Sequence, residues 1–128
     1  MFEIDNKIDR IKYYFKKVIS TCELNVIATG SSNKVQLTNE KCTIDLSTGR
    51  YYCEFTIHIT NIENGQKYYI GDLLNKMGLI AGTKLLSENE ISDANQINDE
   101  LEASLFAWGI ILNKYFSDIL NGDFSILG

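Results

Sequence analysis

Apolar side chains recur every three or four positions at the start of the chain. The residues in this repeat are Ile4, Ile8, Ile11, Phe15, Val18, Ile19 and Cys22. This spacing predicts an amphipathic helix over residues 5–22 with one buried stripe. The other face of the helix is basic and carries Lys7, Arg10, Lys12, Lys16 and Lys17.

From Leu24 the hydrophobic period changes to two, which predicts β-strands. Residues 25–29 fit a short strand, and residues 30–33 have the composition of a turn. Apolar residues then alternate with polar ones up to a turn at 47–49, at Val35, Leu37, Cys42, Ile44 and Leu46. A long strand over 50–61 returns the chain. Asn64-Gly65 predicts a type I′ hairpin turn before a last strand at 67–70.

The long strand has two chemically different sides, because successive strand residues point to opposite faces. Its apolar side carries Tyr51, Cys53, Phe55, Ile57 and Ile59, and its polar side carries Tyr52, Glu54, Thr56, His58 and Thr60. With the turn at 47–48, Cys42 faces Cys53, and with the turn at 48–49 it faces Phe55. In both registers the thiols of Cys42 and Cys53 are neighbours on the core face, where we interpret them as small buried side chains.

The C-terminal half is predicted to be helical. Residues 72–78 form a short helix that ends at Gly78, and residues 79–92 have the composition of a loop. Helical spacing then continues through Ile97, Leu101, Leu105, Trp108, Leu112, Tyr115 or Phe116, and Ile119. Gly122 supplies the stop of this long helix, and Asp93 with Gln96 resembles a capping box at its start.

These elements together predict an α+β fold. It has an N-terminal helix, a three- to four-stranded antiparallel meander, a short helix, and a long C-terminal helix packed on one face of the sheet. The chain shows no internal repeat or linker, so we expect residues 1–128 to form a single domain.

Charge is unevenly distributed along the chain. The whole chain has 12 basic and 17 acidic residues and a net charge of -5, which disfavours direct binding to nucleic acid. Residues 1–84 carry 11 basic and nine acidic side chains, whereas residues 85–128 carry one and eight. No basic residue lies between Lys84 and Lys114, where the acidic residues are Glu88, Glu90, Asp93, Asp99, Glu100 and Glu102. These acids either compensate a helix dipole or meet a basic partner.

Catalytic chemistry is sparsely represented. His58 is the only histidine, and its predicted strand face supplies no clear nucleophile. Asp99 and Glu102 share a helical face but have no histidine beside them, which is a weak pattern for a metal site. No phosphate-binding glycine motif or CxxC pair is present. We therefore expect a non-enzymatic protein without cofactor or metal.

Tyrosines suggest a second binding surface. They occur as adjacent pairs at 13–14, 51–52 and 68–69, so one member of each strand pair faces outward. A sheet face with Tyr52 and one of Tyr68 or Tyr69, close to His58, could anchor a partner. The alternative interpretation is that tyrosine is simply a good strand former.

The N-terminal residues Met-Phe-Glu-Ile-Asp carry acid where a secretory signal carries base. No apolar run approaches the roughly 18 residues of a membrane span. We therefore expect a cytoplasmic protein that does not contact a membrane.

In size, acidity and layout, and in the ending from Tyr115 to Ser125, the chain resembles small immunity proteins of polymorphic and contact-dependent bacterial toxin systems. This resemblance implies a monomer or weak dimer that binds a cognate basic toxin domain, often a nuclease, and occludes its active site with acidic residues. The chain is also similar to acidic chaperones of secreted effectors, which are dimers. It departs from them in having a loop and a long helix where the chaperones have further strands.

Overall fold

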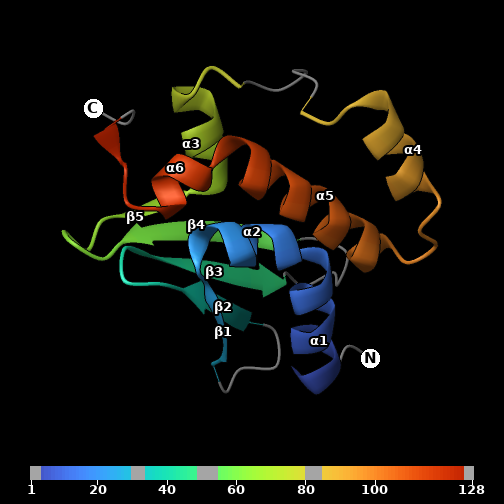
Figure 1. Cartoon of the computed structure of the whole chain (residues 1–128), viewed down its shortest axis with the longest axis horizontal. Helices are drawn as coiled ribbons and strands as arrows, with labels where there is room; N and C mark the ends of the chain where they lie inside the picture. The colour runs from blue at the N-terminus through green and yellow to red at the C-terminus, as the bar shows by residue number, and fades with distance from the viewer. Residues whose placement is uncertain (1–3, 30–33, 49–54, 80–84, 126–128) are drawn as a thin grey trace.

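The computed structural model describes residues 4–29, 34–48, 55–79 and 85–125, with an α+β architecture (Figure 1). Its helices are α1 (Ile4–Tyr14), α2 (Lys16–Cys22), α3 (Ile70–Lys76), α4 (Glu88–Asn95), α5 (Glu100–Tyr115) and α6 (Ser117–Leu120). Its strands are β1 (Asn25–Ala28), β2 (Lys34–Thr38), β3 (Cys42–Thr48), β4 (Phe55–Asn61) and β5 (Lys67–Tyr69). The predicted fold class is confirmed.

The first predicted helix is two helices, because the chain leaves helical geometry at Phe15, where φ is -102° and ψ is 10°. Its buried stripe is nonetheless confirmed at Ile11, Phe15, Val18 and Cys22. Helix α2 ends at Glu23, which adopts the left-handed conformation that closes the helix.

The five strands form one antiparallel sheet in the order β1-β2-β3-β4-β5, so each strand pairs with its neighbour in the chain. The sheet has at least one strand more than the predicted three or four, because the chain turns between Leu37 and Cys42. The sequence contains a sign of this turn. Buried residues are odd-numbered at Val35 and Leu37 and even-numbered from Cys42, a shift that one continuous strand cannot make.

The predicted β3–β4 registers are wrong. Cys42 pairs with Asn61, and Thr48 pairs with Phe55, so the connection between β3 and β4 is longer than a tight turn. Cys53, the predicted neighbour of Cys42, lies outside the described residues. The alternation of sides is confirmed where it is described: Ile57 and Ile59 are fully buried, while Thr56, His58 and Thr60 are not.

The hairpin at 63–66 is in the predicted place but is not a type I′ turn. Asn61 and Gln66 still pair across it, and the amide N–H of Gly65 donates to the carbonyl of Asn61 at 2.7 Å. The loop therefore has four residues, and in it Gly65 has a positive φ while Asn64 does not.

The predicted loop at 79–92 is partly wrong, because α4 begins at Glu88. The predicted long helix is also divided, into α5 and α6. At this break the hydroxyl of Ser117 donates to the carbonyl of Asn113, and such bonds to the preceding turn bend helices. Gly78 and Gly122, both with positive φ, follow α3 and α6 as predicted.

One hydrophobic core lies between the apolar face of the sheet and the helices. Strands β2 to β4 contribute Val35, Leu37, Cys42, Ile44, Leu46, Ile57 and Ile59, and the helices contribute Ile11, Phe15, Val18, Leu73, Leu105, Leu112, Phe116, Ile119 and Leu120. Trp108 is only partly buried against this core. Figure 1 shows α4 at the edge of the molecule, beside α5.

The side chain of Asn39 joins the β2–β3 turn to two helix ends. Its Nδ2 donates to the carbonyls of Cys22 at 2.8 Å and Leu120 at 2.9 Å. Its Oδ1 accepts from the backbone N–H groups of Lys41 at 2.7 Å and Cys42 at 2.9 Å. Both donors and both acceptor positions of the amide are therefore used.

Gly109 allows α5 to cross the α1–α2 junction closely. A Cβ atom at this position would collide with the carbonyl oxygen of Tyr14 and would lie 3.1 Å from the ring of Phe15. The absence of a side chain at 109 therefore fixes how near these helices approach, and it shapes the surface between them.

We expect Asn39→Ala to lower the free energy of unfolding by about 3 kcal/mol, because it removes four hydrogen bonds and leaves two helix-end carbonyls without this donor. Urea denaturation measures the change. Asn64→Ala is the control, since its side chain makes one exposed hydrogen bond, to the N–H of Gln66 at 2.8 Å. Equal losses in both variants would contradict the role of Asn39.

Candidate interaction surfaces

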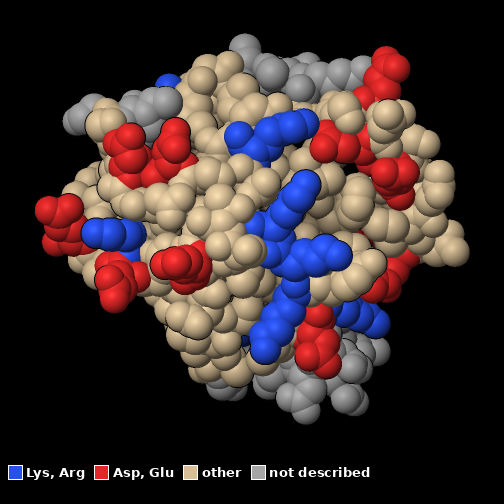
Figure 2. Space-filling model, in the orientation of Figure 1, with Lys and Arg blue, Asp and Glu red and all other residues tan. Residues whose placement is uncertain are grey.

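The six acidic residues between Lys84 and Lys114 all lie on α4, on the connection to α5, or in the first turn of α5. Four of them, Glu88, Asp93, Asp99 and Glu100, are exposed, and we call these four residues the acidic surface. Figure 2 shows acidic side chains gathered over α4 and the start of α5, at the right of the view. The structure therefore brings the predicted residues together.

Helix caps hold this region in place. Ser87 caps α4: the N–H of Glu90 donates to the Ser87 hydroxyl at 3.2 Å, and the N–H of Ser87 donates to the Glu90 carboxylate at 2.7 Å. Asp99 caps α5 by accepting from the N–H of Glu102 at 3.1 Å. The predicted capping box of Asp93 and Gln96 is wrong, because Asp93 lies inside α4.

Glu90 and Glu102 have counter-ions from distant parts of the chain. The ammonium group of Lys114 donates to Glu90 at 2.9 Å. The Nε of Arg10 lies 3.8 Å from Glu102, and the Tyr14 hydroxyl donates to the same carboxylate at 3.4 Å. Neither pair is evident from the sequence, because the partners are far apart in the chain. Lys114 lies beside α4 because α5 runs back along it, and Arg10 lies near Glu102 because α1 packs against the start of α5.

These contacts shift two ionisation equilibria. The backbone N–H of Ser87 and the ammonium of Lys114 lower the pKa of Glu90. Burial, followed by the nearby charge of Glu102, raises the pKa of Tyr14. The carboxylates of Glu90 and Glu102 are thus paired with side chains of other helices, whereas the four residues of the acidic surface are exposed to solvent.

Helix α4 carries this surface without contributing to the core. None of its residues is buried, and Ile91 is 36% exposed among the acidic side chains. A helix that buries no side chain within its own chain has a face available for another molecule.

His58 lies on a different surface, the polar face of the sheet, and Tyr52 lies outside the described residues. His58 pairs with Asp45 on one side and Tyr69 on the other, and the rings of His58 and Tyr69 are 5.7 Å apart. Tyr69 is 48% exposed. Tyr68 instead faces the core side and stacks on Phe124. The structure does not bring His58 together with the acidic surface.

Asp45 on this sheet face was missed from sequence. It is only 6% exposed, and it accepts from Gln36 Nε2 at 2.8 Å. The ammonium groups of Lys34 and Lys67 lie 3.6 and 3.9 Å from its two oxygens. A polar residue in an alternating strand is expected to be solvated, and only the sheet topology shows that side chains of β2 and β5 reach Asp45.

Nothing in the described part of the chain forms a group of three or more His, Cys, Asp or Glu side chains that could hold a metal ion. Cys22 and Cys42 are buried, and burial raises the pKa of Cys42 to about 12. This raised pKa keeps the Cys42 thiol protonated and unreactive at neutral pH. None of the described helices is both long and apolar enough to cross a membrane.

Comparisons with protein-family models, curated protein sequences and solved structures find no match to this chain.

We expect the Glu90 ion pair to stabilise the protein in a pH-dependent way. Because the folded pKa of Glu90 is lowered, its carboxylate contributes stability above the unfolded pKa of about 4.3, and this contribution is lost as the pH falls through the folded pKa. Glu90→Gln keeps a capping side chain and should cost ~0.5 kcal/mol at neutral pH. Denaturation at neutral and acidic pH measures this difference. A difference that persists in strong acid would contradict the assignment, and Glu63→Gln in the β4–β5 loop is the control.

Proposed function

We propose that this protein is a non-enzymatic binding module of the immunity type, which neutralises a basic bacterial toxin domain by covering its active site. The observation that carries the proposal is α4, an acidic helix that buries none of its own side chains. The resemblance in size, acidity and layout to immunity proteins supplies the class of partner.

The arrangement of the acidic surface supports electrostatic recognition. Its residues lie on or cap two helices, so their backbone is already ordered before a partner binds. Clustered like charge attracts a partner of opposite charge and speeds the encounter. Ile91, exposed among the acids, adds an apolar contact that would be buried in a complex.

An acidic chaperone of a secreted effector is the alternative function. Such a chaperone would be a stable dimer that holds an extended peptide. Helices α4 and α5 follow α3 where these chaperones have further strands, which favours the immunity type. Light scattering during size-exclusion chromatography separates the two proposals: a monomer or weak dimer that binds a folded basic domain supports immunity, and a stable dimer that binds unfolded peptide supports the chaperone.

The acidic surface is tested with the double variant Asp93→Lys and Glu100→Lys. Both side chains are exposed and neither caps a helix, so we expect the fold to be kept. The partner for this test is a basic toxin domain, to be sought in the neighbouring reading frame. We expect its association rate at low salt to fall by about tenfold or more, and the deficit to shrink as salt rises. Stopped-flow fluorescence measures these rates.

The matched control is Glu40→Lys with Glu63→Lys, which makes the same change in net charge at two exposed positions in the hairpin loops. It should leave the association rate nearly unchanged. An equal loss in both double variants would mean that net charge alone matters, and no loss in the first would rule out the acidic surface as the contact.

A further inference from the structure

A groove of about 370 Å³ lies between α1–α2 and α4–α5, beside the acidic surface. The aromatic rings of Tyr14 and Phe106 and the side chain of Ile110 line it, together with three lysines, Lys16, Lys17 and Lys114. The backbone of Gly109 forms part of its wall, at the point where α5 crosses the α1–α2 junction. The volume is at the lower end of the range of small-molecule sites.

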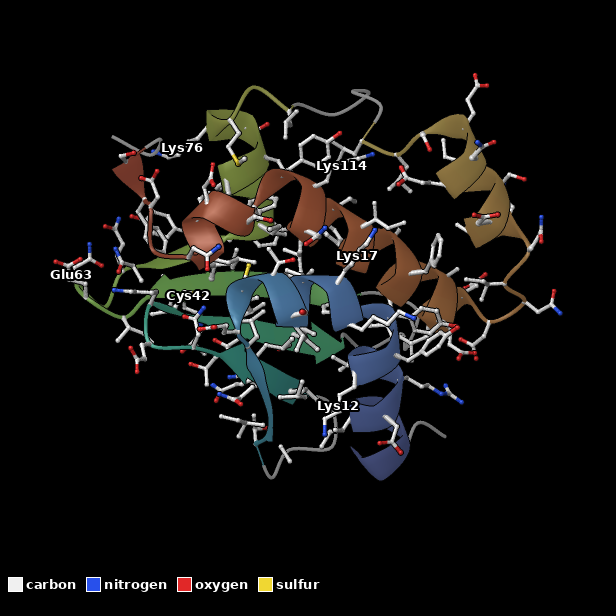
Figure 3. All side chains as sticks on the ribbon, viewed as in Figure 1. Lys12, Lys17, Cys42, Glu63, Lys76 and Lys114 are labelled. Carbon is white, nitrogen blue, oxygen red and sulfur yellow. The ribbon has the colours of Figure 1, made fainter. Side chains whose placement is uncertain are left out.

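The charge of the groove is opposite to that of the whole chain. The groove is lined by three ammonium groups and one carboxylate, that of Glu90. The local charge is therefore +2, in a protein with a net charge of -5. Lys114 is paired with Glu90, whereas Lys16 and Lys17 form no ion pair with any residue that the structure describes. Figure 2 shows basic side chains along the middle of one face, and Figure 3 places Lys17 of α2 and Lys114 of α5 on that face.

Like charges gathered at one groove repel each other, and a bound anion relieves this repulsion. Among the acidic residues that the structure describes, Glu90 alone lines the groove with the three lysines. The Lys16 ammonium lies over the ring of Tyr13, 5.2 Å from its centroid, and this contact does not neutralise its charge, so the charges of Lys16 and Lys17 are available to an anion.

The apolar part of the groove specifies the rest of the ligand. The rings of Tyr14 and Phe106 meet edge to face, with centroids 6.4 Å apart. The hydrogen bond from the Tyr14 hydroxyl to Glu102 holds the first ring in place. A planar ring can pack against this preformed aromatic wall while its charged substituent reaches the ammonium groups.

We propose that this groove binds a small aromatic anion, in which a planar ring packs on Phe106 and Tyr14 and a phosphate is held by Lys16, Lys17 and Lys114. This site is independent of the proposed toxin contact, which uses the outward-facing acids. A nucleotide and an aryl phosphate both have this chemistry.

The test is a titration of the isotope-labelled full chain, followed by the backbone amide signals in NMR spectra. The probes are adenosine monophosphate and phenyl phosphate. The controls are inorganic phosphate, which lacks the aromatic ring, and adenosine, which lacks the phosphate. We expect at least one aromatic phosphate to shift the signals of Lys17, Gly109 and Ile110 saturably, and to bind about tenfold or more tightly than inorganic phosphate or adenosine. Which of the two binds distinguishes a nucleotide from an aryl phosphate.

Two charge reversals locate the site. Lys17→Glu removes a groove lysine at an exposed position in the first turn of α2, where an acid suits the helix dipole, so the fold should be kept. It should weaken binding by about tenfold, whereas Lys12→Glu, an exposed lysine on α1 outside this groove, should change it by less than about twofold.

Three results would overturn the proposal: no saturable shift with either aromatic phosphate up to about 10 mM, binding of inorganic phosphate as tight as that of the aromatic phosphates, or equal weakening by the two lysine variants. Each of these results can be measured without a protein partner, so a failure of this proposal is distinguishable from a failure of the proposed function.

Discussion

The fold depends on a single side-chain amide, that of Asn39. Its four hydrogen bonds join the β2–β3 turn to the last carbonyls of α2 and α6, so the sheet and two helices meet at one residue. Two of these bonds shape the turn itself, and the other two satisfy carbonyls that helices leave unpaired at their ends. The same residue thus reverses the chain and sets the position of the helices over the sheet.

Much of this fold follows from hydrophobic periodicity. The stripe through Phe15 and Val18 and the alternation through Ile57 and Ile59 each predicted the correct buried side. This is possible because the period of a helix or strand relates residues that are only a few positions apart in the chain. The breaks within the helices and the β3–β4 register were not predictable in this way. The α5–α6 break goes with a hydrogen bond between a side chain and the backbone, from Ser117 to Asn113, and the strand register and the approach of α5 to the Tyr14 carbonyl at Gly109 depend on contacts between distant residues.

The candidate sites show the same division. The six acidic residues between Lys84 and Lys114 were predicted as a group, and the structure places them together on α4 and the start of α5. Sequence proximity could not show that Glu90 and Glu102 are paired with Lys114 and Arg10, because those partners come from other helices. The groove was equally hidden, because its lysines lie on α2 and α5 and become neighbours only when these helices pack.

Helix α4 is joined to the protein mainly through surface contacts, since it buries no side chain and its capping glutamate pairs with Lys114. Such an element can open locally without exposing the core, so its amide protons should exchange at a lower opening free energy than those of α5. Because α4 contributes no buried side chain, the packing of the core places few constraints on which residues the outward face of α4 carries. Related chains could therefore diverge in α4 and change the molecule that they recognise, while the remainder of the fold stays the same.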